Sequence, residues 1–161
     1  VKYFITNQDI EFVIVGAGAK KEWLVEETKN FTNIKHYMPV EYATLPDLLC
    51  SADLHILFAK NDVVDTVMPS KLLGMMASAK PSVVTGSLDS EVAKVFDKAQ
   101  GGYFFDSDDF ESVVKSIEEL VFDTIKSKKM GENARKYIVE HFASTKVLAD
   151  FEKKVQEVID N

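Results

Sequence analysis

The chain has 161 residues, which is enough for one α/β domain with a substantial core. Apolar residues make up 46% and charged residues 28%, which excludes a disordered chain, and the net charge of -7 argues against nucleic acid as a partner. The single cysteine excludes an internal disulfide and a cysteine metal cluster. It fits a reducing compartment, and the sequence holds no apolar run long enough to span a bilayer.

Strands and helices are predicted to alternate from the first strand onward. Apolar runs bounded by turn residues predict strands, and longer polar-faced segments between them predict helices. Trp23, Leu24 and Thr28 are expected to face inward from the first helix. Strands are expected at 11–16, 33–37, 53–59, 82–85 and 102–105, and helices at 20–30, 45–52, from Pro69 to the stop at Pro81, and at 91–99.

After the last predicted strand the pattern becomes purely helical. Apolar residues recur at i, i+3, i+4 and i+7, the spacing of amphipathic helices. Three helices are expected, marked by Phe110, Val113, Val114, Ile117, Leu120 and Val121, by Met130, Ala134, Tyr137, Ile138 and His141, and by Val147, Leu148, Phe151, Val155 and Val158. The fold expected is therefore α/β, a Rossmann-like, doubly wound parallel sheet with additional C-terminal helices. Ligands of such sheets bind at the carboxyl ends of the strands.

The stretch from Met68 to Val84 is the most informative part of the sequence. Pro69 is placed in the first turn of a small, apolar helix, where its missing N–H costs nothing. A helix start at the carboxyl end of a parallel sheet favours anions, because free N–H groups and the helix dipole point at it. Lys71 adds a positive charge that the dipole alone would disfavour, and this predicts a phosphate ligand. The alternative is an ordinary first turn in which Ser70 and Lys71 are solvated.

Several segments together carry a resemblance to a known family. They are 12–18 (FVIVGAG), 33–37 (NIKHY), 52–57 (ADLHIL), Pro69 through Val84, 101–106 (GGYFFD), and 130–135 (MGENAR) with Phe142. In this order the chain resembles the C-terminal half of family 4 glycosyltransferases of the two-domain GT-B fold. The similarity runs from about Glu11 to the end, and the start of the Pro69 helix is similar to members that build bacterial capsule, O-antigen and exopolysaccharide units.

The resemblance implies a donor-binding domain covering residues 1–161, a piece of a longer two-domain enzyme. Such an enzyme is retaining, needs no metal or cofactor, and moves a sugar from a nucleotide-sugar, with UDP-sugar as the first candidate, to a glycan or lipid-linked acceptor. The acceptor domain would be the missing N-terminal half, and peripheral membrane association is expected through that half. The expected location is the cytoplasm, at the inner face of the membrane, and the isolated chain is expected to be inactive.

The binding residues expected for the donor come from three segments. Diphosphate is placed at the start of the Pro69 helix, the base near Tyr37 to Glu41, and the sugar near Gly16 to Gly18 and Asp62 to Thr66. The positions concerned are Gly16, Gly18, Tyr37, Val40, Glu41, Asp65, Thr66, Pro69, Ser70, Lys71, Leu72 and Gly74. No catalytic residue is assigned.

The sequence departs from the family pattern at the donor site. The family usually carries two glutamates seven residues apart around this helix. The second, which holds the ribose, aligns with Gly74, and the first falls close to Asp65 or Thr66. Met38 stands where the family often has glycine. The family's basic pair for the diphosphate has no match before Glu11, where only Lys2 is basic.

Other features have a plainer interpretation beside the functional one. Gly16-Ala17-Gly18 lacks the third glycine of a dinucleotide fingerprint, so it is either a simple turn or a turn that admits a diphosphate or sugar. Asp62 and Asp65 are interpreted as a solvated acidic loop rather than a metal site, and Asp65 as a contact for donor hydroxyls. Asp108 with Glu111 predicts a helix cap rather than a metal motif.

The remaining candidates are interpreted as structural. The histidines lack metal-ligand spacing, so no metal is assigned, and His55 is expected to be a hydrogen-bonded core residue. Cys50 is expected to be buried, and 103–105 (YFF) to be sheet core rather than a stacking platform. Two other functions stay open: a non-catalytic Rossmann-like binding module, and a nucleotide-sugar epimerase of the same two-domain fold.

Overall fold

A computed structural model of the chain describes residues 2–4, 7–59 and 68–160. It divides into two compact units, Val1–Asp47 and Leu48–Asn161. Each unit is described by itself.

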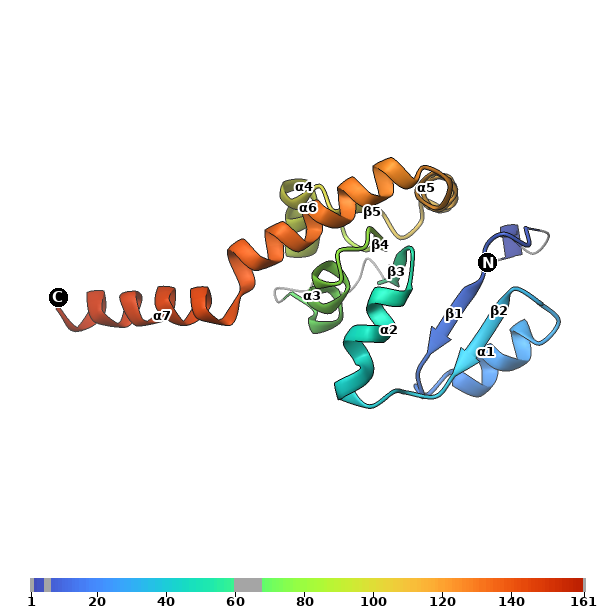
Figure 1. The fold of residues 1–161 in the computed structure, drawn as a ribbon, viewed down its shortest axis with the longest axis horizontal. Helices are drawn as coiled ribbons and strands as arrows, with labels where there is room; N and C mark the ends of the chain where they lie inside the picture. The colour runs from blue at the N-terminus through green and yellow to red at the C-terminus, as the bar shows by residue number, and fades with distance from the viewer. Residues whose placement is uncertain (1, 5–6, 60–67, 161) are drawn as a thin grey trace. The chain divides into compact units, whose positions relative to one another are not determined.

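The first unit is built around a parallel strand pair, β1 and β2. Phe12 pairs with Ile34 at one end of the pair and Val15 with Tyr37 at the other. Asn33 ties the preceding segment down, because its amide donates to the carbonyl oxygens of Phe4 at 2.8 Å and Ile10 at 3.3 Å. The elements of this unit are η1 (Lys2–Phe4), β1 (Phe12–Val15), α1 (Lys21–Thr28), β2 (Ile34–Tyr37) and η2 (Tyr42–Thr44), shown in Figure 1.

The second unit contains a three-stranded parallel sheet in the order β3-β4-β5. His55 pairs with Ser82, and Ser82 in turn with Gly102. Each strand is followed by a helix, as the alternating sequence pattern predicts. The elements are α2 (Leu45–Ser51), which spans the division between the units, and then β3 (His55–Phe58), α3 (Ser70–Ala77), β4 (Ser82–Thr85), α4 (Glu91–Ala99), β5 (Gly102–Phe105), α5 (Phe110–Phe122), α6 (Thr124–Phe142) and α7 (Ser144–Ile159).

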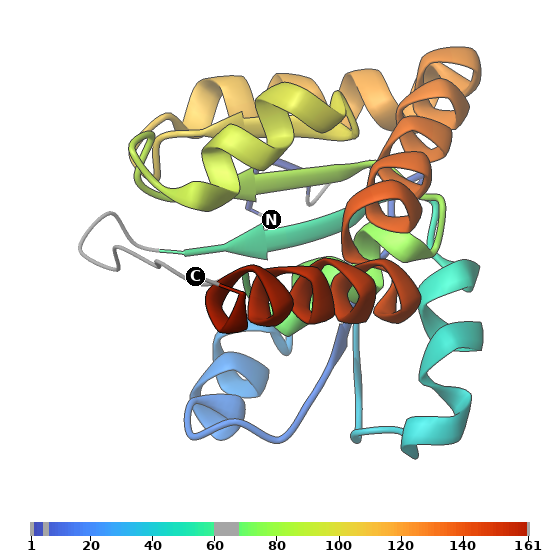
Figure 2. The same cartoon turned by 90° about the vertical axis from the view of Figure 1, so that its left-hand side faces the viewer.

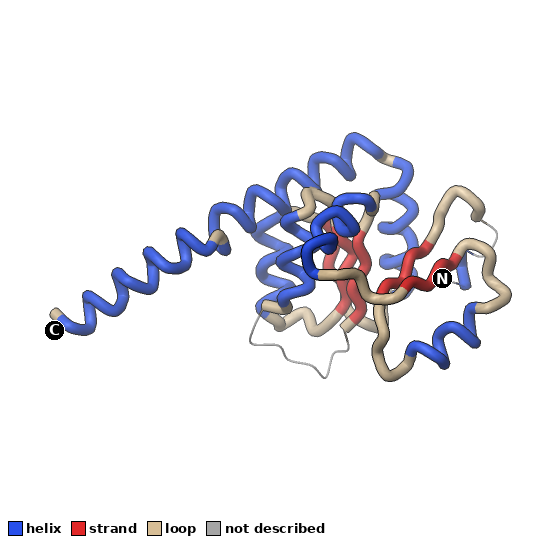
Figure 3. The backbone as a smooth tube through the Cα atoms, turned by 60° about the horizontal axis from the view of Figure 1, so that its bottom comes forward, coloured by secondary structure: helices blue, strands red, loops and turns tan. Residues whose placement is uncertain are grey.

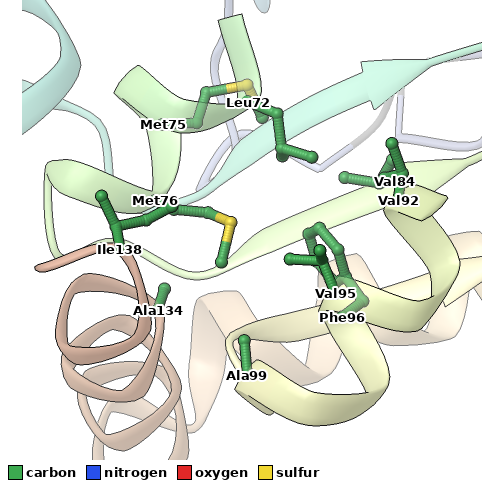
Figure 4. Packing of buried hydrophobic residues seen from close by; sticks show 10 residues of the cluster. All are labelled: Leu72, Met75, Met76, Val84, Val92, Val95, Phe96, Ala99, Ala134 and Ile138. Carbon is green, nitrogen blue, oxygen red and sulfur yellow. The ribbon is translucent and has the colours of Figure 1, made fainter. Parts of the chain in front are cut away.

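Helices cover both faces of this sheet (Figures 2 and 3). On one face Val84 joins a core with side chains from α3, α4 and α6, which Figure 4 shows at close range. Neighbouring residues of a strand point to opposite faces, so the fully buried Val83 faces the other side, and α5 contacts β4 and β5. The core on the first face comprises Leu72, Met75, Met76, Val84, Val92, Val95, Phe96, Ala99, Ala134 and Ile138. The expected α/β, Rossmann-like fold is confirmed. The described strands form two parallel sheets, β1-β2 and β3-β4-β5.

α6 lies against the end of α3 with almost no space between the backbones. A Cβ at Gly131 would come within 2.1 Å of the Ala79 carbonyl oxygen. Arg135 donates from Nη1 to the Ala77 carbonyl oxygen nearby. Residues 130–135, which carried part of the family resemblance, therefore hold α6 against the turn that ends α3. That turn passes through Ala79 at φ 60°, so the helix ends well before Pro81.

α7 has no buried residue, contrary to what its apolar spacing predicts. Phe151 is 64% exposed, and the other apolar positions of this face are exposed too. In the described part of the chain no helix is long and apolar enough to cross a membrane.

Four further local predictions differ from the structure. Trp23 is 60% exposed instead of facing inward, and Cys50 is exposed instead of buried. Phe110 begins α5 but is exposed. The cap of α5 is Asp109, whose carboxylate accepts from the Ser112 N–H at 3.1 Å, one residue after the predicted Asp108.

Candidate functional site

The start of α3 presents Ser70 and Lys71 at its first two positions. Pro69 has extended backbone (φ -61°, ψ 131°) and directly precedes the helix, so it is the N-cap rather than a first-turn residue as predicted. Among the described side chains none caps this end. The N–H groups of Leu72 and Leu73 turn back to the Pro69 carbonyl oxygen, at 3.0 and 3.3 Å. Ser70 and Lys71 are exposed, so their side chains can meet a ligand.

The topology fixes where this helix start lies. β3 and β4 are parallel neighbours, so the helix that joins them must run back along the sheet. α3 therefore begins at the carboxyl edge of the sheet and ends at the amino edge. The carboxyl edge is where ligands of parallel sheets bind.

Two of the predicted site residues in α3 already lie against other parts of the second unit. Leu72 is fully buried in the core, and its N–H is already bonded to Pro69. Gly74 is half-buried, and a Cβ built on it would lie 3.2 Å from Cδ1 of Leu49 in α2. A larger side chain at position 74 would require a small shift of the Leu49 side chain.

The far end of α3 is fixed by a buried histidine. Nε2 of His55 lies 2.9 Å from Oγ of Ser78, whose hydroxyl donates to the Met75 carbonyl oxygen at 2.6 Å. Because the Ser78 hydroxyl proton is donated to the Met75 carbonyl oxygen, Nε2–H of His55 must be the donor in the hydrogen bond between His55 and Ser78. Burial, and then the nearby Lys80 charge, hold the pKa of His55 below its usual value. The expected hydrogen-bonded core histidine is confirmed.

In the first unit, two predicted segments meet at the carboxyl ends of β1 and β2. The Gly16 N–H donates to the Tyr37 carbonyl oxygen at 3.1 Å, which closes the strand pair. A Cβ at Gly16 or Gly18 would meet nothing within 4 Å, so the backbone here is open to approach. Tyr37 is 54% exposed, and Val40 and Glu41 are exposed beside η2.

Lys21 is a candidate that the sequence reasoning missed. It is the first residue of α1, and its ammonium contacts Sδ of Met38 in the loop after β2. This contact joins the start of α1 to the 37–42 loop. The signal was present in the sequence, since Lys20 and Lys21 directly follow the glycine turn.

The remaining predicted positions divide between the parts of the chain. Gly16, Gly18, Tyr37, Val40 and Glu41 belong to the first unit, and Pro69 to Gly74 to the second. Asp62, Asp65 and Thr66 lie outside the described residues. Within 2–4, 7–59 and 68–160 no group of three or more His, Cys, Asp or Glu side chains could hold a metal ion.

The chemistry available at the start of α3 is anion recognition. It combines a hydroxyl donor at Ser70, an ammonium at Lys71 and the positive end of a helix dipole. No carboxylate lies in the first turn to oppose an anion.

A comparison with protein families identifies the type of protein. The model of the family described as "Glycosyl transferases group 1" matches residues 2–137. The chain belongs to this family. The predicted membership of the glycosyltransferases with a GT-B fold is thus confirmed.

Two curated relatives agree with this assignment. The chain is 25% identical over 150 residues to "Putative colanic acid biosynthesis glycosyl transferase WcaI" of Escherichia coli K12. This match covers 91% of the chain and 36% of the relative. It is 24% identical over 156 residues to N-acetyl-alpha-D-glucosaminyl L-malate synthase of Bacillus anthracis, covering 96% of the chain and 39% of that relative. The chain thus spans well under half the length of these relatives.

Solved structures show the same fold. The Anabaena protein HepE, crystallised in complex with UDP-glucose, superposes with a TM-score of 0.72 at 14% identity. The superposition covers 91% of this chain and 41% of HepE.

Proposed function

We propose that this chain is the nucleotide-sugar-binding part, residues 1–161, of a retaining, hexosyltransferase-type glycosyltransferase. The whole enzyme would move a sugar from a UDP-sugar to a glycan or lipid-linked acceptor in cell-surface polysaccharide synthesis. The missing N-terminal half would bind the acceptor, in the cytoplasm at the inner face of the membrane. The observation that carries the proposal is the start of α3, where Ser70 and Lys71 are exposed and no side chain of the described residues caps the helix.

The diphosphate of the donor would bind at the start of α3. Ser70 and the first backbone N–H groups would donate to phosphate oxygens, and Lys71 would supply the counter-charge. Charge on the leaving nucleotide grows in the transition state, so these fixed donors would also assist the reaction. The UDP-sugar class is supported by the UDP-glucose complex of HepE and by the family.

The base and sugar would be bound by the first unit. The open backbone at Gly16 and Gly18 would admit the sugar, and the exposed segment from Tyr37 to Glu41 would contact the base. Lys21 would add a second positive charge beside the glycine turn. Asp65 and Thr66 are proposed near the donor sugar on the family resemblance alone.

Titration with nucleoside diphosphates tests the site. UDP, GDP and ADP are added separately while chemical shifts are followed by NMR. Binding is expected in roughly the high-micromolar to millimolar range, because the proposed acceptor-binding part would not be present to close over the nucleotide. The shifts should change at residues 14–19, 37–42 and 69–73, and changes confined to other regions would overturn the proposal.

Lys71→Ala is the decisive variant. It should weaken UDP binding by about 1.5–3 kcal/mol, the range for hydrogen bonds to charged groups, with little change in stability. Lys98→Ala is the matched control, since Lys98 is an exposed lysine in the last turn of α4. Equal UDP affinity in Lys71→Ala and the unaltered chain would show that Lys71 is only a solvated residue.

A further inference from the structure

Two side-chain contacts fasten the end of β2 to helix α1 in the first unit (Figure 1). At the end of α1, Oγ1 of Thr28 lies 2.8 Å from Nε2 of His36. At the start of α1, the ammonium of Lys21 contacts Sδ of Met38. His36 and Met38 stand on either side of Tyr37, the last residue of β2, so α1 holds the strand end on both sides of that residue.

The hydrogen bond between His36 and Thr28 has one direction. The Thr28 hydroxyl donates its proton to the Leu24 carbonyl oxygen at 2.7 Å, within α1. Because that proton is already used, Nε2–H of His36 must be the donor to Oγ1 of Thr28. Both side chains are half-buried. The bond therefore connects β2, through the Thr28 hydroxyl, to the backbone of the last turn of α1.

Such polar contacts are important for α1, because none of its side chains is fully buried. Most helices in proteins are held chiefly by the burial of an apolar face. Where little apolar surface is buried, the loss of one hydrogen bond changes the local position of the two elements that it joins. Loss of the bond between His36 and Thr28 should therefore be felt at the end of β2.

The same arrangement leaves the Tyr37 ring accessible. Successive residues of a strand point to opposite faces, so this ring lies on the face of β2 away from His36 and α1. The Tyr37 side chain is 54% exposed, while its carbonyl oxygen accepts from the Gly16 N–H at 3.1 Å. Residues 36, 37 and 38 are thus each held by a contact, and the tyrosine ring is still open to a ligand.

We propose that His36 is a positioning residue for the nucleotide base. It acts through Thr28 without touching the nucleotide, and it fixes the end of β2 from which Tyr37 and the segment to Glu41 extend. A binding segment that is ordered beforehand loses less conformational entropy when the ligand binds. The inference rests on the proposed function, because that function places the base at this segment.

Removal of the hydrogen bond tests this role in the 161-residue chain. Thr28→Val removes the hydroxyl, and His36→Phe removes the donor but keeps a ring. Affinities for UDP and for inorganic pyrophosphate, which has the charged groups of UDP but no base, are measured by NMR titration. Each variant should bind UDP roughly three- to tenfold more weakly and pyrophosphate within about twofold of the unaltered chain, because only the base-binding segment has lost its order.

Three further variants separate positioning from a general loss of structure. Thr28→Ser keeps the hydroxyl and should bind UDP within about twofold of the unaltered chain. The double variant His36→Phe/Thr28→Val should bind UDP no more weakly than either single variant, because both changes remove the same bond. Ser116→Ala is the matched control, since the Ser116 hydroxyl also donates to a carbonyl oxygen four residues earlier, that of Ser112 in α5, at 2.8 Å. Its UDP affinity should not change, and circular dichroism should show equal helix content in all variants.

The possible outcomes distinguish this inference from the proposed function. If the unaltered chain binds UDP and Thr28→Val binds it equally well, His36 has no positioning role, and the proposed function is unaffected. Equal losses of affinity for UDP and pyrophosphate, or losses that add in the double variant, would also overturn the role of His36. No shift change at residues 37–42 when UDP is added to the unaltered chain would overturn the base site of the proposed function and this inference with it.

Discussion

Gly74 is the residue at which this chain departs most plainly from its family at the proposed ribose contact. In the structure a Cβ at position 74 would lie 3.2 Å from Cδ1 of Leu49 in α2, so the end of that flexible side chain would have to shift slightly. Glycine in the middle of a helix costs about 1 kcal/mol relative to alanine. The absence of a side chain at Gly74 leaves room for the Leu49 side chain to pack against α3.

Substitution of Gly74 tests the alignment of α3 with the donor. Gly74→Glu should bind UDP more tightly than Gly74→Ala, by about 1.5–3 kcal/mol if the carboxylate reaches the ribose hydroxyls. Both variants must move the flexible end of Leu49, so alanine corrects for that cost. Isothermal titration of the two variants gives the comparison. An affinity of Gly74→Glu at or below that of Gly74→Ala would show that position 74 does not face the ribose.

His55 gives the second unit a stability that depends on pH. Its pKa is lowered in the folded chain, chiefly by burial and then by Lys80, so the unfolded chain binds the proton more readily. The stabilisation is complete above the unfolded pKa near 6.5. It is lost progressively as the pH falls from that value toward the lowered folded pKa.

His55→Gln should flatten this part of the pH profile. Urea unfolding measured between about pH 7.5 and 5 should show a smaller loss of stability for His55→Gln than for the unaltered chain. Glutamine can still donate to Ser78 but does not titrate. His141→Gln serves as control, since His141 is exposed in the last turn of α6. If the stability of His55→Gln fell with pH as much as that of the unaltered chain, other groups would be responsible for the loss of stability in acid.

At the scale of elements, sequence patterns predicted which segments form strands and helices but not always which side faces the core. The alternation of apolar runs and helices is a local property, so every expected strand appears within about two residues of its predicted bounds. The orientation of Trp23, Phe110 and Phe151 depends on what lies opposite, which spacing alone does not contain. The same limit applies to the site, where exposed Ser70 and Lys71 fit the prediction but the burial of Leu72 was not foreseen.

Close approach of elements was also beyond the sequence patterns. Gly131 looks like a weak point in a helix, yet its missing side chain admits the Ala79 carbonyl oxygen. Gly102 likewise lies at φ 150°, with the Ser82 carbonyl oxygen 1.9 Å from a built Cβ. Both contacts join residues more than ten positions apart, so no window of local sequence can show them.

Gly131→Ala should destabilise the second unit despite the better helix propensity of alanine. A Cβ at 2.1 Å from a backbone oxygen forces α6 away from the end of α3, and overpacking of this kind costs about 1–3 kcal/mol. Urea unfolding should show the loss. Gly18→Ala is the control, because its Cβ meets nothing within 4 Å and its stability should stay within about 0.5 kcal/mol. Equal stability of Gly131→Ala and the unaltered chain would mean that the α3–α6 contact is looser than described.

At the scale of the whole molecule, the chain matches only part of the length of its curated relatives. It covers 36% and 39% of the two curated relatives, while the family model extends from residue 2 to 137. The groups described at the start of α3 are a hydroxyl, an ammonium and backbone N–H groups, which suit an anionic ligand. Under the proposed function these groups would hold the donor, and the acceptor would be bound by another part of the whole enzyme.

The isolated chain should therefore bind nucleotide without transferring sugar. Chemistry in a two-domain transferase needs donor and acceptor held together, and positioning of this kind supplies about 7–11 kcal/mol of the barrier reduction. The chain is incubated with UDP-sugars and glycan acceptors, and released UDP and glycosylated product are both measured. Neither should exceed the rate without protein. Lys71→Ala separates genuine activity from contamination, because only activity at the proposed site depends on that lysine. Transfer by the unaltered chain that disappears in Lys71→Ala would show that these 161 residues hold a complete active site, and the donor-binding role would have to be replaced by a full enzymatic one.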